Sequence, residues 1–135
     1  MSKLGERLQD ASRSGAYRAT RAAQIVDAAR GSSLEVVRID AKQGVFDALA
    51  RALEFPAWFG RNWDALEDCL GDLSWRPAGG ELLLFETFPS GKELEMLLDV
   101  LRSSAQFWAA RSRPFFAVFV DPQRELALPD LPGES

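Results

Sequence analysis

The residues best suited to chemistry in this chain are carboxylates at helical spacing. Asp64, Glu67 and Asp68 lie in one stretch, residues 62–73, and Asp72 follows four positions after Asp68. At about 100° per residue these side chains share one face of a helix. The apolar residues of the stretch fall on the opposite face: Trp63, Leu66, Leu70 and Leu73. Like charges four residues apart destabilise a helix, so this face is either a plain solvated surface or a surface kept for a cationic partner.

Enzymatic chemistry has few candidate groups here. The chain has no histidine and one cysteine, Cys69, so it lacks the residues for a Ser/His/Asp triad, a Cys/His dyad or a zinc site. Gly79-Gly80 is a turn signal and no phosphate-binding loop. Cys69 lies at the edge of the apolar stripe, where a small core residue is expected. We therefore expect no catalytic residue, metal or cofactor. The alternative is a metal-dependent enzyme that uses Asp64, Glu67 and Asp68.

Charge favours a protein partner. The chain has 135 residues and a net charge of −4. Residues 1–30 carry six basic and three acidic side chains, whereas residues 31–135 carry ten and seventeen. An acidic surface repels nucleic acid and attracts a basic protein. The single cysteine and the absence of an apolar leader or a long apolar run predict a cytoplasmic protein without membrane contact. We expect the free chain to be a monomer.

The apolar pattern predicts an α/β fold. Strands are expected at residues 34–39, 81–86 and 115–120, and helices at 20–30, 45–53, 62–73 and 90–110. Apolar strands separated by helices are typical of a parallel sheet with helical cover. Residues 31–121 would form this domain. Residues 1–30 would be an N-terminal extension with a helix at about 20–30, and the sequence leaves open whether this extension packs on the domain or adds a strand. Residues 122–135 would be a loose C-terminal tail.

Aromatic residues surround the acidic stretch. Pro56 ends the preceding helix and Asn62 is suited to cap the next one. Trp58 lies in the loop between them, where exposure and burial are equally compatible with the sequence, and Trp75 is not placed by any pattern. Phe59 and Trp63 are expected to pack in the core, and Phe107 and Trp108 are expected to pack near the end of the helix at residues 90–110. Exposed aromatic residues beside charges of one sign are typical of protein interfaces.

Residues 53–70, LEFPAWFGRNWDALEDCL, resemble the signature of the barstar family. The shared features are a leucine at a helix end, a proline, two aromatic residues, a glycine, an asparagine and then D-A-L-x-D-C-L. The resemblance implies a two-layer fold with a three-stranded parallel sheet. It also implies a non-enzymatic activity, which is inhibition of an extracellular-type ribonuclease inside the cell that produces it.

The resemblance also assigns partner-binding residues. Asp64 and Asp68 match the family's interface aspartates, and Asp68 would occupy the phosphate pocket of the ribonuclease. Trp58 matches a tyrosine that packs on the enzyme, and Gly60 and Asn62 match the loop that crosses its active site. This sequence departs from the family pattern at three positions: Glu67 replaces a tryptophan, Arg61 stands where glutamate is common, and Ser103 aligns with an interface glutamate. These departures bear on the identity of the partner more than on the fold. The partner could be another ribonuclease or another basic toxin. We include Glu67 in the predicted interface. The alternative is a barstar-like module that regulates a partner other than a nuclease.

Overall fold

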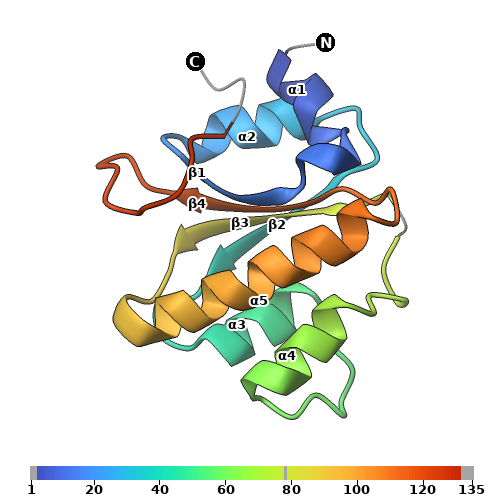
Figure 1. The fold of residues 1–135 in the computed structure, drawn as a ribbon, viewed down its shortest axis with the longest axis vertical. Helices are drawn as coiled ribbons and strands as arrows, with labels where there is room; N and C mark the ends of the chain where they lie inside the picture. The colour runs from blue at the N-terminus through green and yellow to red at the C-terminus, as the bar shows by residue number, and fades with distance from the viewer. Residues whose placement is uncertain (1–2, 78, 132–135) are drawn as a thin grey trace.

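The computed structural model describes residues 3–77 and 79–131. Within these residues, four strands form one parallel sheet in the order β1-β4-β3-β2 (Figure 1). The strands span Gly15–Ala19 (β1), Glu35–Asp40 (β2), Glu81–Thr87 (β3) and Phe115–Val120 (β4). Leu83 of β3 pairs with Val37 on one side and Ala117 on the other, so the apolar centres of three strands are in register.

Helices cover both faces of the sheet (Figure 1). They span Lys3–Leu8 (α1), Ala22–Ala29 (α2), Val45–Ala52 (α3), Trp63–Leu70 (α4) and Gly91–Ala109 (α5). Side chains alternate along a strand, so Leu82 and Leu84 face the core beneath α1 and α2, while Leu83 and Phe85 face the core beneath α3, α4 and α5. The fold therefore has three layers and two separate apolar cores.

The three-stranded, two-layer arrangement expected from the sequence is wrong. Residues 15–19 add β1 beside β4, and α1 and α2 cover the second face of the sheet. The physical reason lies in β3 and β4, which are apolar on both faces and need cover on both. Leu4 and Leu8, one turn apart on α1, supply part of that cover, together with Ile25 of α2.

Gly79 and Gly80 let β3 enter the sheet between its neighbours. A Cβ atom on Gly79 would lie 2.2 Å from the Ser33 carbonyl oxygen, and one on Gly80 would lie 2.6 Å from the Pro114 carbonyl oxygen. Gly80 also has a φ of +106°, which side chains disfavour. This turn therefore brings the starts of β2, β3 and β4 together.

The loose tail expected after β4 is also wrong for residues 122–131. The Asp121 carboxylate accepts hydrogen bonds from the backbone N–H groups of Glu125 and Leu126. The Arg18 guanidinium binds Asp130 at 2.8 Å and the Leu126 carbonyl at 2.9 Å. Leu128 and Leu131 are buried. The remaining residues of the expected tail, 132–135, lie outside the described part of the chain.

Candidate functional site

The loop before α4 is held by aromatic packing. Phe59 is buried, as expected, and its ring centroid lies 4.9 Å from that of Phe55. Trp63 is half-buried against Phe46, with ring centroids 4.8 Å apart. Trp58, which the sequence left open, is 63% exposed. The other aromatic side chains here therefore pack against one another, and one tryptophan, Trp58, faces solvent.

Asn62 caps α4, as the sequence predicts. Its Oδ1 accepts a hydrogen bond from the Ala65 N–H at 2.8 Å, which satisfies one free donor at the start of the helix. Its Nδ2 donates to the Gly60 carbonyl at 3.3 Å. A Cβ atom on Gly60 would lie only 3.3 Å from Asn62 Nδ2, so glycine lets the loop close on the cap. Both residues are exposed and lie beside the first acidic residue of the helix.

α4 has a buried face and an acidic face. Leu66, Leu70 and Cys69 are fully buried, and burial raises the pKa of the Cys69 thiol. Asp64, Glu67 and Asp68 are exposed on the other side and will be called the acidic edge. Cys69 is thus a core residue, as expected. The expected orientation of the helix is confirmed.

The nearby arginines are engaged elsewhere. Arg61 Nε binds Oδ1 of Asp47, in the first turn of α3, at 2.6 Å. Arg76 Nε binds the buried carboxylate of Glu81 at 3.3 Å. None of the ion pairs formed among the described residues involves the acidic edge. Its carboxylates therefore face solvent without an internal counter-charge.

Asp72 does not belong to the helical face, contrary to the sequence prediction. α4 ends at Leu70, and Leu73 adopts a left-handed φ of 51°, so the chain turns away before a further helical turn forms. Asp72 Oδ1 instead accepts a hydrogen bond from the Ser74 N–H at 3.3 Å. The face expected to carry four carboxylates thus carries three.

Two tryptophan side chains fix the ends of the neighbouring helices. Trp108 Nε1 on α5 donates to the Leu70 carbonyl at 2.7 Å, which satisfies an unpaired acceptor at the end of α4. Trp75 Nε1 donates to the Leu53 carbonyl at 2.9 Å, just after α3. Trp75 is therefore a half-buried structural residue, and the position of α4 is set by hydrogen bonds as well as by packing.

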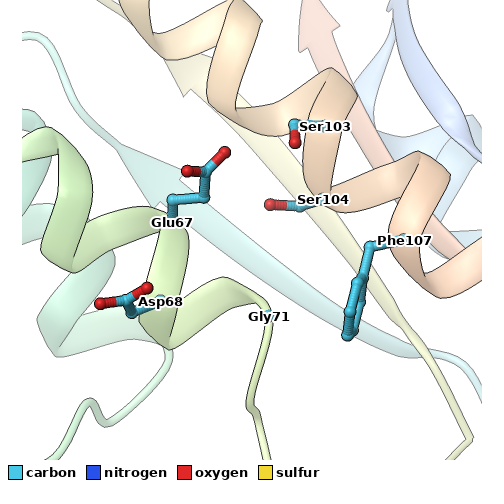
Figure 2. A pocket seen from close by; sticks show the side chains of 6 residues that line it. All are labelled: Glu67, Asp68, Gly71, Ser103, Ser104 and Phe107. Atoms are coloured by element: carbon cyan, nitrogen blue, oxygen red, sulfur yellow. The ribbon is translucent and has the colours of Figure 1, made fainter.

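A groove of about 330 Å³ runs between α4 and α5 and continues the acidic edge (Figure 2). Its lining consists of Glu67, Asp68, Gly71, Ser103, Ser104 and Phe107. Phe107 is 37% exposed, and its ring packs against Trp108 near the end of α5, as expected, with ring centroids 5.0 Å apart. Sequence reasoning missed Ser104 and Phe107 as site residues. The available signal was a serine within the apolar stripe formed by Leu97, Leu101 and Ala105.

The predicted site residues fall on one side of the molecule, along the loop and the acidic edge. Trp58, Gly60 and Asn62 precede α4 directly, and the groove brings Ser103 of α5 beside Glu67 and Asp68. Among the described residues, no group of three acidic or cysteine side chains is arranged to hold a metal ion. No helix of the described chain is long and apolar enough to cross a bilayer.

Comparison with known proteins identifies a family. No curated protein and no solved structure matches the chain significantly. A sequence model of one family, described as Barstar (barnase inhibitor), matches residues 31–120. That range runs from just before β2 to the end of β4 and contains the capped loop, the acidic edge and the groove. Because the match covers two-thirds of the chain, this protein belongs to the barstar family.

Proposed function

We propose that this protein inhibits a basic ribonuclease of the secreted type by placing its acidic edge in the active site of the enzyme. The family consists of barnase inhibitors, which supports a ribonuclease as the protein partner. We further propose that inhibition takes place in the cytoplasm, before the enzyme leaves the cell. In this proposal the chain performs no catalysis and needs no cofactor.

The observation that carries the proposal is the unpaired state of the acidic edge. Asp64, Glu67 and Asp68 are exposed, and the two arginines nearest in sequence bind other carboxylates. A ribonuclease binds RNA phosphates with cationic side chains, and a carboxylate offers the same charge and the same bidentate geometry to arginine. The edge is thus suited to replace RNA phosphates in such a cleft.

The loop before α4 supports the same orientation. Trp58 is the large apolar side chain with the greatest exposure among the described residues, and it lies just before the cap formed by Gly60 and Asn62. A tryptophan beside a charged patch contributes contact area that excludes water from the neighbouring ion pairs. We therefore assign partner contacts to Trp58, Gly60 and Asn62 together with Asp64, Glu67 and Asp68.

The test is inhibition of a purified barnase-type ribonuclease that cleaves a fluorogenic RNA. We expect the wild-type chain to abolish activity at a one-to-one ratio and to co-elute with the enzyme in gel filtration. The triple variant Asp64→Asn/Glu67→Gln/Asp68→Asn should keep its circular dichroism spectrum and lose inhibition. Full activity of several such ribonucleases in excess wild-type chain, with no co-elution, would contradict the proposal and favour a partner other than a nuclease.

A further inference from the structure

Ser104 has an unusual environment on α5. Ser104 is buried, with only 3% of its surface exposed. Its hydroxyl has no hydrogen-bond partner among the described residues. A buried hydroxyl without a partner destabilises a protein, because it loses its bonds to water without replacement. Figure 2 shows the hydroxyl turned from α5 toward α4, into the groove. A partner for this hydroxyl would have to enter through this groove.

Glu67 supplies a negative charge to the same groove. Figure 2 shows its carboxylate directed toward α5, whereas the carboxylate of Asp68 is directed away from α5. Neither group forms an ion pair within the described chain. The two neighbouring residues thus point to different places, and Glu67 is the one that faces the serine.

Phe107 forms an aromatic wall of the groove and already binds a guanidinium. The Arg111 Cζ lies 3.6 Å from the centroid of the Phe107 ring, and Arg111 Nη1 donates to the Phe107 carbonyl at 2.9 Å. Arg111 is not among the residues that line the groove. The ring is 37% exposed, which leaves part of its surface for a second cation.

We propose that the groove between α4 and α5 receives an arginine side chain of the protein partner, with its guanidinium against Phe107, paired with Glu67 and bonded to Ser104 Oγ. The inference rests on the proposed function for the existence of a basic protein partner. Arginine fits better than lysine because its planar guanidinium can stack on the Phe107 ring and donate hydrogen bonds to Glu67 and Ser104 at the same time. An ammonium group is a compact, strongly hydrated charge and matches this combination less well.

Short peptides test the groove without any ribonuclease. The probes are capped glycine pentapeptides with arginine, lysine or glutamine at the centre, titrated into the ¹⁵N-labelled chain. We expect the arginine peptide to shift the amide signals of Ser104 and Phe107 saturably in the millimolar range, and the lysine peptide to bind on the order of threefold more weakly. No saturation up to about 100 mM, or equal binding of the lysine and arginine peptides, would overturn the proposal.

Ser104→Ala distinguishes a binding hydroxyl from a structural one. The substitution removes an unsatisfied polar atom, so the melting temperature should stay the same or rise, while binding of the arginine peptide weakens several-fold. Phe107→Leu keeps an apolar side chain, removes the ring and should also weaken binding. Glu95→Gln, an exposed charge change elsewhere on α5, is the matched control and should bind as wild type. A lower melting temperature in Ser104→Ala together with unchanged peptide binding would show a structural hydroxyl and contradict the proposal.

The same variants separate this inference from the proposed function. Peptide binding that depends on Ser104 and Phe107, in a chain that inhibits no ribonuclease, would support the groove and contradict the inhibitor role. Ribonuclease inhibition by a Ser104→Ala/Phe107→Leu variant as strong as that of the wild type, with no peptide binding by the wild type, would contradict the groove alone.

Discussion

Carboxylates are used in opposite ways in two regions of this molecule. Glu81, at the start of β3, is fully buried and binds both Arg113, at 2.8 Å, and Arg76, at 3.3 Å. The acidic edge of α4 carries three exposed carboxylates with no cation bound to any of them among the described residues. The first region neutralises its charge internally, and the second leaves its charge available.

The two regions are linked through Arg76. This arginine is close enough in sequence to neutralise the end of the acidic helix, but it turns inward to Glu81. Arg113 is the second arginine bound to Glu81, and its Cζ lies 4.6 Å from the centroid of the Trp108 ring. Internal pairing thus keeps cations away from the acidic edge. The comparison predicts that charge removal at Glu81 harms folding, whereas charge removal on the edge harms binding.

The largest effect is expected for Glu81→Gln. The substitution would leave two largely buried guanidinium groups without a counter-charge, because the side chains of Arg76 and Arg113 are only 9% and 11% exposed. Loss of one partner from a buried ion pair lowers the free energy of unfolding by about 3–5 kcal/mol. Urea denaturation followed by circular dichroism measures the change.

Glu86→Gln is the matched control for this prediction. Glu86 pairs with Arg38 at 2.7 Å, and that hydrogen bond lowers the pKa of Glu86, but both side chains are well exposed. Exposed ion pairs contribute little to stability, so this variant should unfold close to the wild type. Equal losses for Glu81→Gln and Glu86→Gln would contradict the structural role given to the Glu81 cluster.

The second effect is on binding. Asp68→Ala should weaken the complex with the ribonuclease by on the order of 2 kcal/mol, about 30-fold, because cations of the enzyme would be buried without a partner. Isothermal titration calorimetry measures the affinity, and Asp99→Ala, which removes an exposed charge from α5, is the control. Wild-type affinity in Asp68→Ala would exclude Asp68 from the interface.

The third effect is on the association rate. Unpaired carboxylates on one edge attract a basic enzyme over distances that salt screens. Raising the ionic strength from about 0.02 M to about 0.3 M should slow association by about tenfold or more, while dissociation changes less. Stopped-flow tryptophan fluorescence, to which the exposed Trp58 contributes, measures the rate. An association rate independent of salt would show that charge does not guide the encounter.

Local patterns in the sequence predicted most of the part of the fold that positions the site. The strand at residues 115–120, the cap at Asn62 and the long helix beginning at Gly91 all appear as expected, because each depends on nearest neighbours in the chain. The sequence left open whether the N-terminal part adds a strand, because GAYRA lacks the β-branched residues that mark strands. The place of β1 depends on pairing with β4, about a hundred residues later.

The candidate site was predictable only where it lies on one segment. The acidic edge follows from helical spacing. The helix nevertheless ends at Leu70 with Gly71 as its C-cap, which leaves Asp72 outside it, and the left-handed residue that follows is Leu73 and not a glycine. The groove needs α5 beside α4, and that contact is set by the Trp108 hydrogen bond to Leu70. Ser104 and Phe107 could therefore be identified as site residues only from the structure.

The smallest expected effect runs opposite to the first. Asp68→Asn relieves repulsion with Asp64 one turn away and removes a negative charge near the C-terminal end of α4, so the free protein should gain about 0.5 kcal/mol of unfolding free energy at low salt. Urea denaturation at two salt concentrations measures the gain, which should shrink as screening increases. Asp47→Asn, which removes a carboxylate that is already paired with Arg61, should give no gain in unfolding free energy. Destabilisation by Asp68→Asn would mean that this carboxylate stabilises the folded chain itself. The distinction between the acidic edge and the Glu81 cluster would then fail at the residue on which the proposed inhibition most depends.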